Sequence, residues 1–204
     1  MIVERHGRTF EVAEEDFSGD WDFWGRFSNG TWEPETLDLI ETMCHGGTFV
    51  DIGAWIGPTS LWAAAHADRV VAIEPDPVAF AVLEKNTARL PNIECHQVAV
   101  GPADGLTTIT TAGDSMSRTG AGDYIVKCYT IKTLFDRLEI TDADLIKMDI
   151  EGAERDVVAY AEPFLRAFGA PLALSMHPWA PGSNLPLNGW RTEDVGHLQI
   201  LATP

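Results

Sequence analysis

The segment at residues 48–58, TFVDIGAWIGP, constrains the fold more than any other part of the chain. It begins with β-branched and aromatic residues at 48–52, which suit a buried strand. Gly53 and Gly57 allow backbone angles and close approaches that a side chain would block. Pro58 suits the first turn of a helix. A buried strand, a glycine turn and a helix N-terminus in this order predict a nucleotide-binding turn in an α/β sheet.

The spacing of this turn indicates which nucleotide it suits. It reads D-x-G-x-x-x-G, with Asp51 where the dinucleotide fingerprint G-x-G-x-x-G has its first glycine. A carboxylate repels a pyrophosphate, but it does not repel a ligand that carries an ammonium, a sulfonium and no phosphate. S-adenosylmethionine is such a ligand, and the turn resembles motif I of class I methyltransferases. An ordinary βα turn with two structural glycines would show the same pattern, so the neighbouring segments must decide.

A second strand supports the same interpretation. The apolar run at 70–73 ends at Glu74, which lies 23 positions after Asp51. This is close to the offset of about 20 residues at which an acid meets ribose hydroxyls in such folds. A carboxylate accepts two hydroxyl hydrogen bonds and therefore fits the ribose of adenosine. The alternative is an acidic loop at the end of a strand in an acidic protein.

Size and charge narrow the class of protein. We expect one methyltransferase domain over 1–204, because the length suits a single α/β core. A net charge of −17 disfavours nucleic acid and anionic lipid as partners. The chain has no apolar run of transmembrane length and no signal pattern, and its three cysteines form no C-x-x-C pair. A cytoplasmic enzyme with reduced thiols, acting without nucleic acid or membrane, fits these features.

Residues 1–45 are expected to form an aromatic-rich N-terminal cap leading into the core. A small hairpin is predicted around His6 and Gly7, and a helix from Glu33 to Met43. Aromatic residues crowd the segment 16–32 between these elements. They suit a cap over the cofactor, a wall for the acceptor, or core and homodimer contacts.

The remaining chain alternates helical and strand patterns. This predicts a mostly parallel, doubly wound sheet of Rossmann-like class I methyltransferase type, with helices on both faces. We expect strands at 93–100, 144–152, 172–176 and 197–203, the second of them ending in two acids. We also expect an antiparallel pair at 107–111 and 124–131, an exposed loop at 112–122, and helices at 76–90, 132–138 and 154–161, the last interrupted by Pro163.

Three sequence blocks, two of them described above, make the resemblance specific. The blocks FVDIGAWIG at 49–57, VVAIEPDP at 70–77 and LIKMDIEGAE at 145–154 occur in this order. Together they resemble the FkbM family of S-adenosylmethionine-dependent methyltransferases. The third block is the most distinctive, and the segments at 30–33 and 130–136 also match. The resemblance covers roughly residues 28–180, with departures at Trp55 and Ser175.

The resemblance implies methyl transfer from S-adenosylmethionine to a hydroxyl of a sugar, glycan or natural product. It places cofactor contacts at Asp51, Gly53, Ala54, Trp55, Gly57, Glu74, Pro75, Asp149 and Glu33. The acceptor is then a small molecule or glycan, and a homodimer is possible.

The acceptor hydroxyl needs a base or a metal ion to become a good nucleophile. His177 and Asp149 are the best base candidates at the carboxyl ends of the strands, His177 because histidine titrates near neutrality. His177 would otherwise be a loop residue that caps the strand. Asp149 and Glu151 alternate and would point to one side, toward the sulfonium, the acceptor or Mg²⁺, whereas Glu151 would otherwise cap the next helix. We assign no metal, and we expect Lys147 to point elsewhere and pair with an acid.

Two other protein classes use similar folds. A nicotinamide oxidoreductase would need the dinucleotide glycines, which are absent. A non-catalytic S-adenosylmethionine-binding module would keep the turn but lose the acids, and this chain keeps them. Methyltransferases with a nitrogen or other small-molecule acceptor stay open. A nucleic-acid methyltransferase is disfavoured by the charge and by the sequence DIEG at 149–152, where an N-P-P-Y-like strand end would stand.

Overall fold

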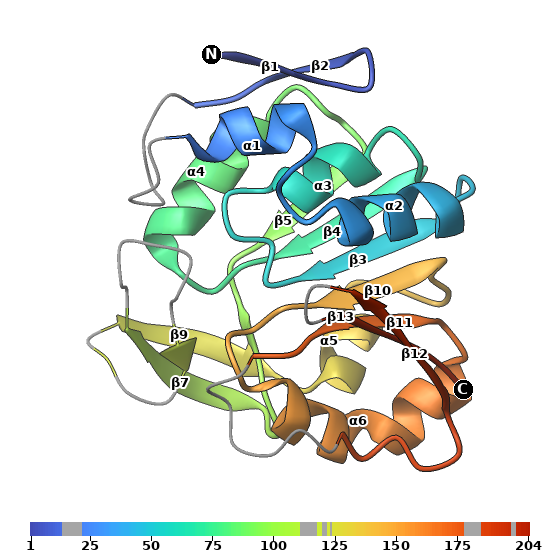
Figure 1. Ribbon diagram of the computed structural model, residues 1–204. Helices are drawn as coiled ribbons and strands as arrows, with labels where there is room; N and C mark the ends of the chain where they lie inside the picture. Colours follow the sequence, from blue (N-terminus) through green and yellow to red (C-terminus); the bar gives the residue numbers. More distant parts are fainter. Residues whose placement is uncertain (14–21, 111–117, 120–121, 123, 178–184, 197–198) are drawn as a thin grey trace.

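The computed structural model describes residues 1–13, 22–110, 118–119, 122, 124–177, 185–196 and 199–204. Within these residues the largest sheet has seven strands in the order β12-β13-β11-β10-β3-β4-β5. Strands β11, β10, β3, β4 and β5 run parallel, whereas β13 is antiparallel to both β11 and β12. The sheet is therefore mostly parallel, as expected (Figure 1).

The strands of this sheet are short, and the four central ones, β11, β10, β3 and β4, are almost entirely buried. The strands span Thr48–Ile52 (β3), Arg69–Ile73 (β4), Ile93–His96 (β5), Leu145–Met148 (β10), Leu172–Ser175 (β11), Arg191–Gly196 (β12) and Gln199–Thr203 (β13). From β3 the chain adds β4 and β5 on one side, and it later returns to add β10 and β11 on the other. This reversal places a topological switch point between β3 and β10, where α/β sheets bind ligands.

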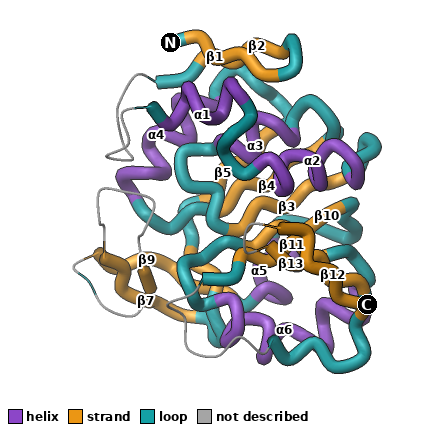
Figure 2. Tube along the Cα trace, in the orientation of Figure 1, coloured by secondary structure: helices purple, strands orange, loops and turns teal. Residues whose placement is uncertain are grey.

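Helices cover both faces of the sheet. One face carries Phe23–Asn29 (α1), Pro34–Met43 (α2), Pro58–Ala63 (α3) and Pro77–Thr87 (α4), and the other carries Ile131–Arg137 (α5) and Glu154–Phe168 (α6) (Figure 2). Adjacent residues of β3 belong to different cores: Phe49 packs with α2 and α3, and Val50 packs with α5 and α6. All five residues of β3 are buried, without the alternation of a half-exposed strand, because both faces of the sheet are covered.

Two smaller sheets flank the main one. Strands Ile2–Arg5 (β1) and Arg8–Glu11 (β2) form the expected N-terminal hairpin. The other small sheet has the order β6-β9-β7-β8 and contains Ala99–Val100 (β6), Gly105–Thr110 (β7), Arg118–Thr119 (β8) and Tyr124–Tyr129 (β9). β7 and β9 are antiparallel, as predicted. Most of the predicted loop at 112–122 lies outside the described residues.

Several predicted boundaries were wrong. The strand predicted at 93–100 divides into β5 and β6, which belong to different sheets, because Val98 N donates to His96 O in a turn between them. β9 ends at Tyr129, since the Thr130 side chain accepts from Thr133 N and caps α5. Helix α4 ends at Thr87, three residues earlier than expected. The predicted final strand, β13, pairs with a strand that was not predicted, β12, whose exposed residues gave no apolar pattern.

Helix α6 continues through Pro163, contrary to the prediction that it stops at Ala161. Proline lacks the N–H that would bond the carbonyl of Ala159. Both residues are exposed, so water can satisfy that carbonyl. Burial of Val158 and Leu165 on either side of the proline holds the helix against the sheet. Across the described residues, none of the helices is both long and apolar enough to cross a membrane.

Candidate active site

The loop after β3 forms the floor of the site through its backbone. Gly53 N and Ala54 N both donate to Ile73 O, at 2.9 and 3.0 Å, which joins the loop to the end of β4. Gly53 has φ +83°, and a Cβ built there would lie 1.7 Å from Asp149 O. Only glycine therefore fits this close approach between the segments that follow the parallel strands β3 and β10.

Glu74 lies beside this loop and is anchored by two backbone groups. Its Oε2 accepts from Trp55 N and its Oε1 from Asp76 N, both at 2.8 Å. Burial outweighs these two hydrogen bonds and raises the pKa of Glu74 to about 7. The two anchors fix the orientation of the carboxylate, and each oxygen keeps a lone pair for a further donor.

Asp51 has a different place from the one predicted. It is fully buried and does not line the cavity. Its Oδ2 accepts from Thr59 Oγ1 and Ser60 Oγ, each at 2.6 Å, and its Oδ1 lies 3.3 Å from Lys147 Nζ. The acid of motif I thus fixes the start of α3 and holds Lys147. Gly57 also lies outside the lining; a Cβ there would approach Leu83 Cδ1 at 2.7 Å, so it permits α3 to pack on α4.

Lys147 pairs with an acid, as expected, but it also lines the cavity. Its Nζ donates to Gly53 O at 3.1 Å. Although burial lowers the pKa of Lys147, the surrounding carboxylates of Asp51, Asp149 and Glu33 outweigh it and raise that pKa. Lys147 and Asp51 are register neighbours on β10 and β3, so the pairing follows from the parallel strands.

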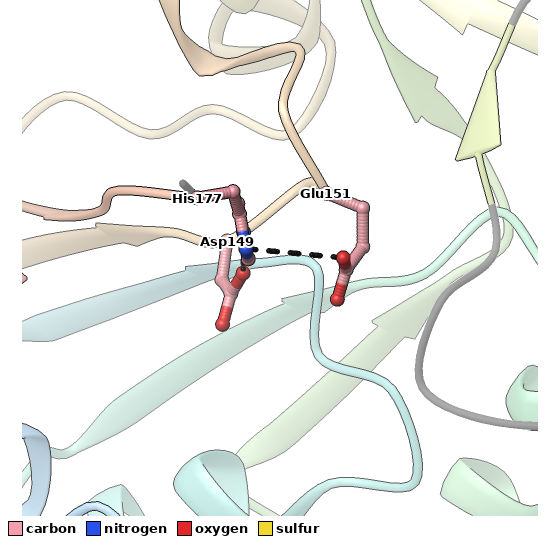
Figure 3. A group of neighbouring side chains, drawn as sticks. All are labelled: Asp149, Glu151 and His177. Carbon is pink, nitrogen blue, oxygen red and sulfur yellow. Dashed lines mark hydrogen bonds and ion pairs between the residues drawn. The ribbon is translucent and has the colours of Figure 1, made fainter. Parts of the chain in front are cut away.

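A group of charged side chains converges at the ends of β10 and β11. Figure 3 shows Asp149, Glu151 and His177 pointing toward one another. His177 Nε2 lies 2.9 Å from Asp149 Oδ1 and 3.4 Å from Glu154 Oε1, and His177 Nδ1 lies 3.9 Å from Glu151 Oε2. Carboxylates therefore face both ring nitrogens.

This environment changes the expected titration of His177. Burial lowers its pKa, but the hydrogen bonds to Asp149 and Glu154 outweigh burial and raise the pKa to about 10. The expectation that His177 titrates near neutrality without perturbation is therefore wrong. Burial raises the pKa of Asp149, but the interactions with His177, Lys147 and Ser175 outweigh burial. The pKa of Asp149 is therefore lower than its ordinary value. The N-cap residue of α6 is Ala153, so Glu151 does not occupy the N-cap position of that helix.

Most of the residues described above line one cavity of about 350 Å³. Of the predicted cofactor contacts, Gly53, Ala54, Trp55, Glu74, Pro75, Asp149 and Glu33 line it, as does His177. The sequence analysis assigned no binding role to other lining residues, among them Lys147, Val98, Ala99 and Val100. The apolar ones gave no signal distinct from core residues.

The aromatic N-terminal segment divides between core and cavity. Trp24 and Phe27 are buried in the core beneath the hairpin. Phe23 and Trp32 line the cavity, and Phe23 packs edge-on against Trp55 with ring centroids 4.7 Å apart. The core role expected for the segment thus describes Trp24 and Phe27, whereas Phe23 and Trp32 lie where a cap over the cofactor or a wall for the acceptor could form. Phe17 and Trp21 lie outside the described residues.

The fold and this site define a class I methyltransferase architecture, and solved structures agree. A methyltransferase FkbM from Methylobacillus flagellatus KT is 20% identical with a TM-score of 0.55; the match covers 95% of this chain but 56% of that one. A putative methyltransferase from Escherichia coli is 13% identical with a TM-score of 0.54, and the match covers 100% of this chain and 97% of that one. A putative methyltransferase from Streptococcus mutans, solved in complex with SAH, is 6% identical with a TM-score of 0.51, over 82% of this chain and 94% of that one.

Residues 51–179 match the family described as the methyltransferase FkbM domain. The chain belongs to this family. It spans little more than half the length of the FkbM protein from Methylobacillus flagellatus. No curated protein matches it.

Proposed function

We propose that this chain is an S-adenosylmethionine-dependent O-methyltransferase that acts on a hydroxyl of a sugar, glycan or natural product. One observation carries the proposal: a single cavity holds an anchored carboxylate for a ribose, Glu74, and a carboxylate–imidazole pair for a proton, Asp149 and His177. Binding without transfer would need only the first of these groups.

The cavity residues fit the methyl donor. Glu74 can accept both ribose hydroxyls, and Val98, Ala99 and Val100 offer an apolar wall for a flat base. Lys147 and Glu33 carry the charges opposite to the carboxylate and ammonium of a methionine moiety. Trp55 also lines the cavity, and its buried indole N–H makes no hydrogen bond within the described residues, so it can donate one to the bound methyl donor.

The bound donor supplies a methyl group on a sulfonium, which leaves as a neutral thioether. The acceptor oxygen forms a bond to the methyl carbon while the carbon–sulfur bond breaks and its electron pair stays on sulfur. Asp149 receives the hydroxyl proton, and His177 holds that carboxylate in place from 2.9 Å. Alignment of oxygen, carbon and sulfur contributes much of the rate.

Aromatic rings and overall charge support the acceptor class. Phe23, Trp32 and Trp55 line the cavity and can pack against the C–H faces of a sugar ring. A net charge of −17 disfavours a polyanionic acceptor such as nucleic acid.

The test is transfer of isotope-labelled methyl from S-adenosylmethionine to a panel of free sugars, glycans and polyhydroxylated natural products. The proposal expects a labelled methyl ether on at least one of them with the unmodified protein. It also expects loss of that product in Asp149→Asn at unchanged cofactor affinity. Labelled amines instead of ethers would show that the acceptor atom is nitrogen.

A further inference from the structure

We propose that Ser175 and Gln199 position the carboxylate of Asp149, in a role that rests on the proposed function. Asp149 follows β10, Ser175 ends β11 and Gln199 begins β13, and these three strands are neighbours in the main sheet (Figure 1). Ser175 and Gln199 are register partners in the antiparallel pair β11 and β13. Asp149 and Ser175 come directly after Met148 and Leu174, which are register partners in the parallel pair β10 and β11. Side chains at neighbouring register positions share one face of a sheet, so the three polar groups form a row across it.

The hydrogen bonds of this row run in one direction. Gln199 Nε2 donates to Ser175 Oγ at 2.7 Å, and the two residues are 3% and 4% exposed. The Ser175 hydroxyl in turn hydrogen-bonds to Asp149. An ionised carboxylate only accepts, so the single hydroxyl proton points to Asp149 and a hydroxyl lone pair accepts from Gln199. The row is therefore a chain of buried donors that ends on the carboxylate.

Asp149 is thus held from two sides. His177 Nε2 lies 2.9 Å from Asp149 Oδ1 and comes from the segment after β11. The Ser175 hydroxyl comes from the end of β11 itself, where the register with β13 fixes its place. One donor would leave the carboxylate free to pivot, whereas two donors fix its orientation. A general base must lie within hydrogen-bond reach of the proton that it takes, so this orientation affects the rate.

The stability cost of the row also indicates a role beyond packing. The rest of β11, Leu172, Ala173 and Leu174, is apolar and buried. Gln199 Oε1 is buried and has no hydrogen-bond partner within the described residues. A buried acceptor without a partner destabilises the folded state, and a pair of apolar side chains of similar shape would avoid that cost. Polar side chains are thus present where packing alone favours apolar ones.

The test uses a double variant, Ser175→Ala with Gln199→Leu, which removes both groups so that neither is left buried without its partner. Ser175→Thr keeps the hydroxyl. Thr87→Val is the matched control: Thr87 is 5% exposed, its hydroxyl donates to Leu83 O within α4, and it does not line the cavity. Circular dichroism and urea unfolding should show that all three variants fold and that the double variant is no less stable than Thr87→Val.

The first readout is the carboxyl-carbon signal of Asp149 in isotope-labelled protein, assigned with Asp149→Asn and followed by NMR over the pH range in which each protein is folded. Loss of a hydrogen bond to a charged acceptor should make Asp149 bind its proton about tenfold more tightly, so the double variant should titrate at higher pH. Ser175→Thr and Thr87→Val should match the unmodified protein. All variants keep the other charged groups around this end of the cavity, which are Lys147, His177, Glu154, Glu151 and Glu33. Equal behaviour of the Asp149 signal in the double variant and in Thr87→Val would overturn the inference.

The second readout is the pH profile of kcat/KM with an acceptor that the unmodified protein methylates. Its acidic limb reports the base of the free enzyme, so it should move to higher pH in the double variant together with the Asp149 signal. We also expect kcat to fall by about tenfold at unchanged S-adenosylmethionine affinity. An acidic limb that stays in place while the signal moves would overturn the role in the reaction. If the signal moves but the unmodified protein methylates no acceptor, the proposed function fails, and the hold of Ser175 and Gln199 on Asp149 is still supported.

Discussion

The two ends of the cavity are built in different ways. At the proposed cofactor end, backbone groups hold the structure: Gly53 and Ala54 bond to Ile73 O, and Trp55 N holds Glu74. At the proposed acceptor end, charged side chains hold one another, with Asp149 and His177 2.9 Å apart. A backbone scaffold tolerates little change in residue size, whereas a side-chain network responds mainly to changes of charge.

The largest effect is expected where the two ends touch. Gly53→Ala would place a Cβ 1.7 Å from Asp149 O, so either β3 or β10 must move. We expect loss of cofactor binding together with a large fall in unfolding free energy in urea. Gly169→Ala is the control, because Gly169 has φ +86° with open space around it and should show only the conformational cost of roughly 1–2 kcal/mol. Equal losses of unfolding free energy in the two variants would mean that Gly53 does not pack tightly against the backbone of Asp149.

Asp149→Asn should separate the two ends. The amide keeps the size of the side chain but cannot take up the hydroxyl proton. Turnover should fall by about 10²–10⁴-fold, the range for loss of general base catalysis. Affinity for S-adenosylmethionine should change only a few-fold, as measured by calorimetry. Full turnover in this variant would exclude Asp149 as the base.

Glu74→Gln should have the complementary effect. Hydrogen bonds to a charged acceptor contribute about 1.5–3 kcal/mol, so removing the charge should weaken S-adenosylmethionine binding by roughly 10- to 100-fold. The turnover number at saturating donor should change far less. If the dissociation constant stays the same, Glu74 does not hold the ribose.

The smallest effect concerns the stability of the ligand-free protein. The pKa of Glu74 is raised by burial to about 7, so the folded state binds the proton more tightly than the unfolded state. The stabilisation from this group is present below its ordinary pKa of 4.5 and is lost as pH rises through about 7. Urea unfolding between pH 5 and 8 should show this decline in the unmodified protein and a flatter profile in Glu74→Gln. Identical profiles would contradict the raised pKa.

The same contrast explains how much could be read from the sequence. The turn at Gly53, the strand before it and the acid at Glu74 follow from local spacing, because each depends on backbone conformation near its own position. The inward place of Asp51 could not be read from its motif, since it depends on Thr59, Ser60 and the cross-strand neighbour Lys147.

At the proposed acceptor end of the cavity, the sequence indicated which residues lie there but not how His177 titrates. His177 and Asp149 both line the cavity, at the ends of the strands to which the sequence assigned them. The pKa of His177 is raised by Asp149 and also by Glu154, which reaches it from the first turn of α6. A similar effect of packing extends α6 through Pro163, because the burial of Val158 and Leu165 on either side outweighs the hydrogen bond lost at the proline. Such effects come from packing between distant segments.

The most direct test is a calorimetric titration of the unmodified protein with S-adenosylmethionine and, separately, with NADH. The account predicts saturable binding of the methyl donor at one site per chain and no binding of NADH, because Asp51 and the spacing after it do not form a pyrophosphate cradle. Binding of NADH, or of neither ligand, would contradict the assignment of the cavity.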